Sequence, residues 1–309
     1  MRSGSAGPAA SDCVLGALHI QIEAPSGAEA TLLDKLLPID PEVAARIDSL
    51  DLSFNKFGFD PYGISKKDLV RFMSVFSWFY RHYFKVDVYG LENLPPRGRG
   101  ILVGNHSGGV AIDGAMVMGS MLLDAEPPRL PHSMIDRFIH QFAGASQFMS
   151  RTGQFTGNPD QAIRLLRDDR LLLVFPEGAR GTAKLAKDAD TLVTFGTGFM
   201  RLALETKSPI IPFGFVGGGE ALPTVANLKA LGRLLGVPYV PVTKWGLLVP
   251  KPTRFQLLYG KPMVFEGSGH ERDDVCGAMV EEVKEKIRDL IRQGRQLREK
   301  KITEADLVL

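Results

Sequence analysis

The sequence predicts an α/β protein with a mixed, largely parallel central sheet flanked by helices. Short and wholly apolar segments, such as 100–104 and 171–175, are typical of strands that are covered on both faces. They alternate with stretches of helical periodicity, and strands that alternate with helices are typical of a largely parallel sheet. The 33 glycines and 20 prolines exceed the usual share and indicate many turns.

The N-terminal part of the chain differs from the rest in composition. Residues 1–38 are rich in Ala, Gly, Ser and Pro, and their weak periodicity predicts a disordered segment. A helical region is expected over residues 39–84. Its first helix is predicted between Asp40 and Lys56, because Asp40 is a good N-cap and the proline after it suits the first helical position.

The second helix of this region is predicted to begin after Ser65 and to end near Phe84. It carries aromatic side chains nearly all round. One interpretation is a helix buried against the core. The other is an element at a lipid interface, because Trp and Tyr suit the level of the lipid headgroups. The sequence alone leaves both interpretations open.

A single α/β domain is expected over residues 85–266, followed by a C-terminal amphipathic helix and tail over 267–309. In this domain we expect strands at 85–89, 100–104, 171–175, 209–216 and 254–259, and helices at 112–123, 160–167 and 197–206. Apolar residues recur at helical spacing from Val275 to Ile291, which predicts the C-terminal helix.

Composition argues against several classes of protein. Lys plus Arg is 37 and Asp plus Glu is 35, a balance that disfavours a nucleic-acid partner. Cys13 and Cys276 cannot form a disulfide framework, and no cysteine–histidine cluster suggests zinc. No stretch reaches the ~18 apolar residues of a membrane-spanning helix, and no signal-peptide pattern opens the chain. We therefore expect a cytoplasmic protein that associates peripherally with a membrane.

The first candidate site directly follows the apolar strand 100–104. Ligands bind at the carboxyl ends of the strands in open α/β sheets, so His106 stands where a general base belongs. Asp113 can return to orient the imidazole if the glycines between the two residues form a tight bend. The alternative is a capping histidine and an aspartate on a helix surface, and the spacing alone leaves both open.

The second candidate site follows the apolar strand 171–175 and reads Phe-Pro-Glu-Gly-Ala-Arg-Gly. Its proline and glycine predict a bend that projects Glu177 and Arg180 over the same sheet edge as His106. The planar guanidinium of arginine suits phosphate or carboxylate recognition. Alternatively, Glu177 and Arg180 form an ion pair that holds this loop.

Together the two motifs resemble those of the glycerolipid acyltransferase family, which includes the lysophosphatidate acyltransferases. The resemblance extends from residue 89 to residue 264 and includes Gly153-Gln154-Phe155 and the segment 208–212. The order His-Ser-Gly-Gly with a delayed Asp is similar to the subset near the monoacylglycerol and diacylglycerol acyltransferases.

This resemblance implies transfer of an acyl group from a thioester, either acyl-CoA or an acyl carrier protein, to a lipid hydroxyl at a membrane surface. It implies no metal or other cofactor. His106 would deprotonate the acceptor hydroxyl, and Asp113 would orient His106. The residues expected to shape the substrate site are Asn105, Ser107, Gly108, Gly109, Phe175, Pro176, Glu177, Gly178 and Arg180.

The acceptor stays open at this point. Arg180 is the arginine that the motifs place at the site, and Arg151 is near enough in sequence to reach in. The block around Gln154 lacks the arginine that many phosphate-accepting members carry. A lysophosphatidate-like acceptor and a neutral lipid alcohol are both possible. Outside this class, a thioester or ester hydrolase and a non-catalytic lipid-binding protein are the alternatives.

A basic and apolar segment spans residues 228–254, where Leu, Tyr and Trp are mixed with Lys and Arg. Such a composition suits the boundary between lipid headgroups and acyl chains. A packed excursion with solvated lysines explains it equally well.

Overall fold

The computed structural model describes residues 38–108, 112–136, 139, 142, 144–246 and 249–309. The segment expected to be disordered, 1–38, lies outside the described residues except for its last residue. Gly109 and Cys13 also lie outside them.

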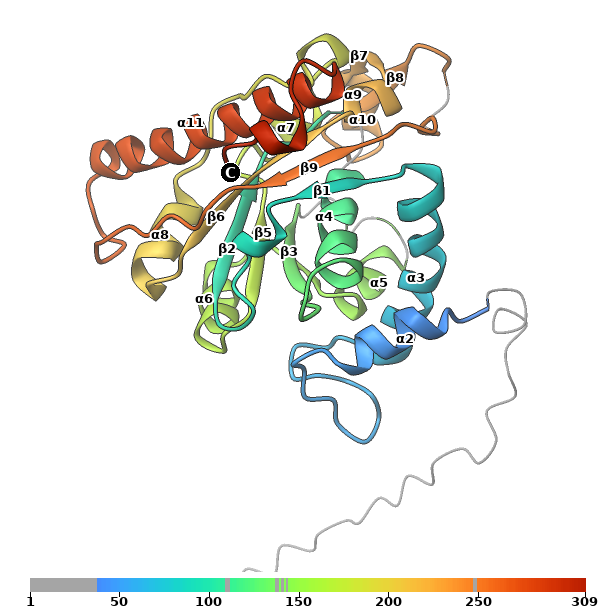
Figure 1. Ribbon diagram of the computed structural model, residues 1–309, viewed down its shortest axis with the longest axis vertical. Helices are drawn as coiled ribbons and strands as arrows, with labels where there is room; N and C mark the ends of the chain where they lie inside the picture. Colours follow the sequence, from blue (N-terminus) through green and yellow to red (C-terminus); the bar gives the residue numbers. More distant parts are fainter. Residues whose placement is uncertain (1–37, 109–111, 137–138, 140–141, 143, 247–248) are drawn as a thin grey trace, which may run out of the picture. The chain divides into compact units, whose positions relative to one another are not determined.

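The core of the molecule is a seven-stranded sheet in the order β1-β9-β6-β2-β5-β3-β4 (Figure 1). The strands are β1 (Asp87–Tyr89), β2 (Gly100–Gly104), β3 (Pro131–Ile135), β4 (Gln154–Thr156), β5 (Leu171–Val174), β6 (Ile210–Val216) and β9 (Gln256–Tyr259). Every neighbouring pair is parallel except β6 with β9, which is antiparallel. The predicted mixed, largely parallel sheet is therefore confirmed.

Helices cover both faces of this sheet. The helices of the described residues are α2 (Pro41–Asp48), α3 (Lys66–Trp78), α4 (Ile112–Leu123), α5 (Ala145–Arg151), α6 (Pro159–Arg167), α7 (Ala179–Thr182), α8 (Gly198–Thr206), α9 (Gly218–Ala221), α10 (Lys229–Leu234) and α11 (Asp273–Arg298). Shorter helical turns are η1 (Phe79–Tyr83), η2 (Leu91–Asn93), η4 (Ala186–Asp188) and η5 (Glu304–Asp306). Asp40, the predicted N-cap, accepts hydrogen bonds at the start of α2, and Ser65 and Asn158 accept one at the start of α3 and α6.

Two apolar clusters lie on opposite faces of the sheet, as the alternation of side chains along a strand requires. Leu102 of β2 packs in one cluster with residues of α2, α3 and α4. Its neighbours Ile101 and Val103 pack in the other, with residues of α6, α8 and α11. The fully buried strand β2 is thus held in place from both sides, and with it the loop that follows it.

The first helix is shorter than predicted. α2 ends at Asp48 and not near Lys56. After it, the Asn55 side chain accepts hydrogen bonds from the backbone N–H groups of Phe57 and Phe59. Asparagine competes in this way with helical backbone pairing, so residues 55–59 form a turn where the helix was predicted to end.

The aromatic helix is only partly buried. Tyr80 and Phe84 belong to the core, whereas Trp78 and Phe79 are exposed at the junction of α3 with η1. The interpretation of a helix packed against the core therefore holds for its buried part, and the lipid-interface interpretation of its exposed part stays a prediction.

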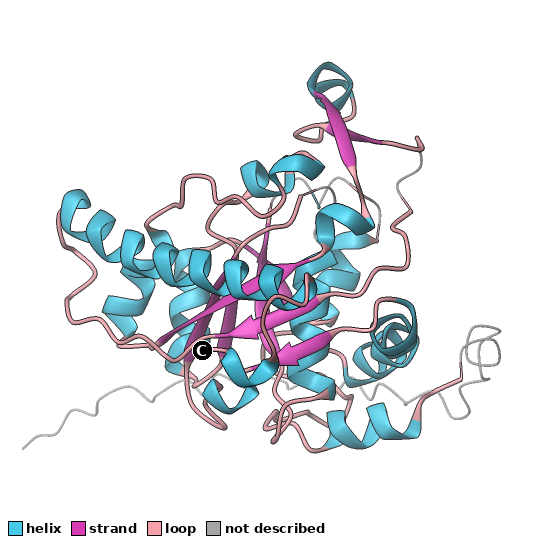
Figure 2. Cartoon of the chain, turned by 45° about the horizontal axis from the view of Figure 1, so that its top comes forward, coloured by secondary structure: helices cyan, strands magenta, loops and turns pink. Residues whose placement is uncertain are grey.

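The segment 228–254 contributes to an excursion from the main sheet. β7 (Thr224–Leu228) and β8 (Val240–Thr243) form an antiparallel pair, with α10 between them. We call residues 224–243 the protrusion, and Figure 2 shows its two strands and helix extending away from the sheet. Among the described residues, no helix combines the length and the apolar character that crossing a bilayer requires.

Candidate active site

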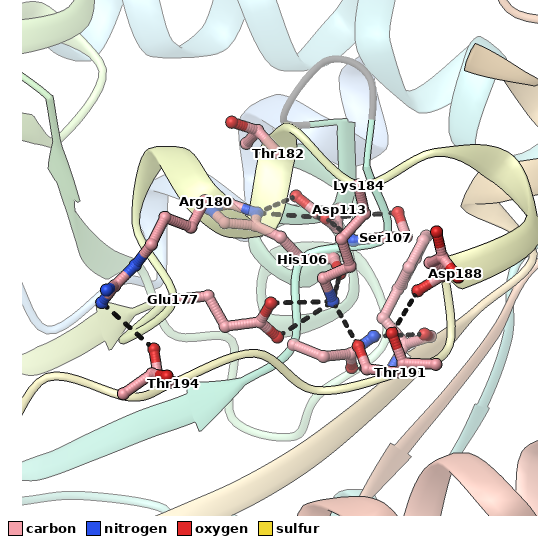
Figure 3. Close-up of polar contacts among 12 residues, drawn as sticks. His106, Ser107, Asp113, Glu177, Arg180, Thr182, Lys184, Asp188, Thr191 and Thr194 are labelled. Carbon is pink, nitrogen blue, oxygen red and sulfur yellow. Dashed lines mark hydrogen bonds and ion pairs between the residues drawn. The ribbon is translucent and has the colours of Figure 1, made fainter. Parts of the chain in front are cut away.

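The two sequence motifs meet at one edge of the sheet. His106 follows the end of β2, and Glu177 follows the end of β5. These two strands are parallel neighbours, with Val103 paired with Val174. Their carboxyl ends therefore bring the motifs together, as Figure 3 shows.

His106 and Asp113 form a buried pair at the centre of this edge. His106 Nδ1 lies 3.1 Å from Asp113 Oδ1 and 3.2 Å from Oδ2. His106 is 7% exposed and Asp113 is fully buried. The structure therefore brings the pair together, while their catalytic roles stay predictions.

Asp113 is held as a carboxylate by more than its histidine. Burial alone raises the pKa of this carboxyl, but His106 and the backbone N–H groups of Ser107 and Gly114 outweigh burial, so the pKa is lowered from its ordinary value. Ser107 N–H donates over 2.9 Å to Oδ2, and Gly114 N–H over 2.9 Å to Oδ1. An ionised Asp113 at neutral pH fixes the tautomer of His106 with its proton on Nδ1.

The imidazole plane is fixed from a second direction by Phe175. The two rings stack with centroids 4.0 Å apart and planes 8° apart. Phe213 packs edge-on against Phe175, with the two ring centroids 5.6 Å apart. Phe175 therefore keeps the His106 ring in one plane. The motif predicted that Phe175 lies at the site, but it did not predict this stacking contact.

Gly108 shapes the bend between the histidine and the aspartate. Its φ is +88°, and a Cβ at this position would lie 2.7 Å from the carbonyl oxygen of Lys184. Both the left-handed conformation and the close approach require glycine.

Asn105 and Ser107 face inward. The Asn105 side chain donates to the carbonyl of Phe215 and accepts from its N–H, which ties the end of β2 to β6. Ser107 Oγ donates to Asp113 Oδ2 over 3.3 Å. Both side chains are buried, so these contacts support the site from behind.

Glu177 forms an ion pair with Lys184 and not with Arg180. Lys184 Nζ lies 3.0 Å from Glu177 Oε1 and 2.8 Å from Oε2. It also donates to the carbonyl oxygens of His106 and Thr191. The alternative of a Glu177–Arg180 ion pair is therefore wrong. Lys184 was missed because it lies outside the motif and its partners include two backbone carbonyls.

Burial dominates the electrostatics of Glu177. Desolvation raises its pKa above the ordinary value, although Lys184 and His106 act in the opposite direction. The loop around it is set by Pro176, whose carbonyl accepts from Gly196 N–H, and by Gly178, whose φ is +55°. The bend predicted from these two residues is present.

Arg180 points away from the histidine (Figure 3). Its side chain is exposed and donates over 3.3 Å to the carbonyl of Thr194. Arg151 was considered near enough in sequence to reach the site. It does not do so, because its guanidinium donates to Asp68 of α3 over 3.2 Å. The two arginines considered for phosphate binding therefore do not converge on His106.

Comparisons with known proteins show which family this chain resembles. A profile of the family described as Acyltransferase matches residues 85–216, a range that contains both motifs. An uncharacterized protein of Mycobacterium leprae is 32% identical over 253 residues, which are 79% of this chain and 67% of that protein.

Two further similarities are weaker. A Gallus gallus protein named DGAT1/2-independent enzyme synthesizing storage lipids is 25% identical over 185 residues, 58% of this chain and 52% of its own length. The crystal structure of the 1-acyl-sn-glycerophosphate acyltransferase PlsC from Thermotoga maritima has a TM-score of 0.49 and 17% identity, covering 72% of this chain and 78% of that one.

Proposed function

Since the chain belongs to the acyltransferase family, we propose that it transfers a fatty acyl group from an acyl thioester to a lipid hydroxyl, with His106 as general base. The observation that carries this proposal is the buried contact of His106 Nδ1 with Asp113. It leaves Nε2 as the nitrogen that can take a proton from an acceptor.

The reaction follows from this geometry. The acceptor hydroxyl gives its proton to His106 Nε2 while its oxygen attacks the thioester carbonyl carbon. The tetrahedral intermediate then collapses, the carbon–sulfur bond breaks, and the thiolate takes the proton back from Nε2. Asp113 stabilises the imidazolium that exists between these steps, and the Phe175 ring keeps its plane fixed.

Ser107 supports direct transfer rather than an acyl-enzyme. Its hydroxyl donates to Asp113, on the Nδ1 side of the imidazole, and the residue is 1% exposed. A nucleophilic serine would have to face Nε2 and the substrate. A thioester is already activated, so a lipid hydroxyl with a positioned base is sufficient.

A neutral lipid alcohol is the acceptor that the charges favour. A phosphate is normally held by more than one cation or donor set. Lys184 is occupied by Glu177 and two carbonyls, and Arg180 bonds to Thr194 away from the histidine. The name of the Gallus gallus relative, which refers to storage lipids, agrees with an uncharged acceptor.

Acyl-CoA and an acyl carrier protein both remain donors in this proposal, and the site of action is a membrane surface with which the protein associates peripherally. The lipid acceptor supports this location, because such molecules reside in the bilayer. The exposed Trp78 and Phe79 also suit the headgroup level.

The test of this function is a His106→Ala variant assayed with an acyl thioester and a panel of lipid acceptors. We expect turnover to fall by at least ~10²-fold, the usual worth of a positioned base, while circular dichroism shows a folded protein. Near-normal turnover in a folded variant would contradict the mechanism. Release of free fatty acid by the unaltered protein, at the same rate without acceptor, would identify a hydrolase instead.

The acceptor class is tested by Arg180→Ala. With a neutral acceptor we expect unchanged kcat and KM, because Arg180 is exposed and does not face His106. A rise in KM confined to a phosphorylated acceptor would instead show that Arg180 turns inward to bind phosphate, and would favour a lysophosphatidate-like substrate.

A further inference from the structure

The protrusion exposes large apolar side chains next to basic ones. Leu234 is 81% exposed and Leu235 is 57% exposed, and Leu228 and Leu231 are exposed beside them. Isolated exposed leucines need no explanation, but a group of four on one small element indicates a surface that is covered by a partner.

The charge of this part of the chain has one sign. No Asp or Glu occurs between Glu220 and Glu266, while six basic residues do. Of these, Lys229, Arg233 and Lys244 are exposed and take part in no ion pair within the described part of the chain. The partner that suits such a surface is apolar inside and negatively charged at its border, as an anionic bilayer is.

The protrusion is joined directly to the active-site loop. Asn227 Nδ2 donates to the carbonyl oxygen of Ala183 over 2.6 Å. Tyr239 shares a hydrogen bond with Thr182, at the end of α7. Lys184 follows these two residues and holds the carbonyl of His106. A bilayer in contact with the protrusion would therefore lie beside the catalytic pair.

A second group of aromatic side chains is linked to the chain that follows the protrusion. Tyr83 donates through its hydroxyl to the carbonyl of Pro250, and its ring centroid lies 6.3 Å from that of the exposed Trp78. Next to Pro250, the Lys251 amine lies 3.6 Å above the ring of Trp245. Tryptophan and lysine together are typical of the headgroup level.

We propose that the protrusion docks onto an anionic bilayer and so presents membrane-embedded acceptors to His106. The second half of this inference rests on the proposed function, whereas bilayer docking does not. An acidic protein, such as a carrier of the acyl donor, would also match the charges. The four exposed leucines favour lipid, because they can enter a bilayer singly without a complementary groove.

The experiment compares two matched double variants of the full chain. Arg233→Glu/Leu234→Glu reverses one cation and charges one exposed leucine on the protrusion. Lys261→Glu/Val264→Glu makes the same kind of change beside Met263, which pairs with Ile210 at the opposite end of β6. Leu234 is 81% exposed and Val264 is 77% exposed, so the two substituted apolar side chains are comparably accessible.

Flotation with vesicles of phosphatidylcholine, with and without phosphatidylglycerol, is the first measurement. Each basic residue near an anionic surface strengthens binding about fivefold, so the protrusion variant should bind anionic vesicles at least about 100-fold more weakly. The control variant should lose much less. Equal binding by the two variants, or no binding by the unaltered protein, would overturn docking.

The second measurement is turnover on an acceptor in vesicles and on a short-chain acceptor in solution. The protrusion variant should lose activity on the vesicle acceptor alone. Loss on both acceptors would show that the protrusion serves the active site and not docking. Loss confined to a carrier-protein donor, with vesicle binding intact, would identify a protein-binding surface. If the unaltered protein transfers no acyl group at all, the proposed function fails while flotation still decides docking.

Discussion

Two buried pairs, each made of a carboxylate and a nitrogen-containing side chain, lie side by side at the same sheet edge, but they leave different groups available for substrate. Asp113 with His106 follows β2, and Glu177 with Lys184 follows β5. All four side chains are nearly closed to water. The pKa of Asp113 is lowered, because His106 and two backbone N–H groups outweigh burial, whereas burial raises the pKa of Glu177.

The difference lies in the nitrogen-containing partners of the two carboxylates. An ammonium has three protons to donate, and Lys184 gives them to Glu177 and to the carbonyls of His106 and Thr191. An imidazole has two nitrogens, and Asp113 engages only Nδ1 of His106. We call Glu177–Lys184 the saturated pair, because all three ammonium protons are donated, and it holds the loops together. We call His106–Asp113 the unsaturated pair, because Nε2 of His106 stays available for chemistry.

The largest expected effect comes from breaking the saturated pair. Lys184→Met leaves Glu177 buried without a counter-charge and the His106 carbonyl without its donor. Removing one partner of a buried pair typically costs about 3–5 kcal/mol, and we expect that fall in the free energy of unfolding in urea.

The double variant Glu177→Gln/Lys184→Met is the control for this prediction. It removes both charges, so it should recover much of the lost stability, because replacing both partners of a buried pair is far less costly than removing one. If Lys184→Met is as stable as the unaltered protein, Glu177 must be reached by water, and the contrast between the two pairs fails.

The same contrast shows how far the sequence leads. β2 and α4 have their predicted bounds, because β2 is apolar throughout and α4 follows a glycine-rich bend. β3 and β4 were not predicted: β3 opens on a proline and a histidine, and β4 has only three residues. Such short strands depend on their neighbours rather than on their own pattern.

The candidate site shows the same limit. The contact of His106 with Asp113 was one of the two arrangements that the spacing left open, and the motif named both residues. Lys184 could not be expected, since two of its contacts are to backbone carbonyls, which any sequence provides. The orientation of Arg180 also depends on the carbonyl of Thr194 and on no residue type.

A smaller effect is expected when the unsaturated pair loses its charge. Asp113→Asn keeps one acceptor for Ser107 or Gly114 but removes the carboxylate beside His106 Nδ1. Hydrogen bonds to charged groups contribute about 1.5–3 kcal/mol, so kcat should fall about 10- to 10²-fold, less than in His106→Ala. Steady-state kinetics on the folded variant measures this. A loss equal to that of His106→Ala would mean that Asp113 does more than orient the ring.

The smallest effect concerns a third buried group, for which the described part of the chain holds no ion pair. His132 in β3 is 2% exposed, and its Nε2 has no hydrogen-bond partner among the described residues. Burial, with a smaller contribution from Arg170, lowers the pKa of His132 from 6.5 to about 3. The folded protein therefore keeps this ring neutral where the unfolded chain binds a proton. Because the unfolded state binds more protons between pH 6.5 and about 3, stability falls as the pH decreases through that window.

For a single group this slope is at most about 1.4 kcal/mol per pH unit. His132→Gln removes this titrating group. Below pH 6.5 the unfolding free energy of the variant, measured in urea, should therefore depend on pH less steeply than that of the unaltered protein, by that amount. Above pH 6.5 the two proteins should show the same dependence. Parallel curves for the two proteins down to about pH 5 would mean that the folded state accepts a proton on His132. In that case burial without a partner would not be enough to keep a side chain neutral here. The opposite pKa shifts of Glu177 and Asp113 would then have to be explained by their contacts and not by burial.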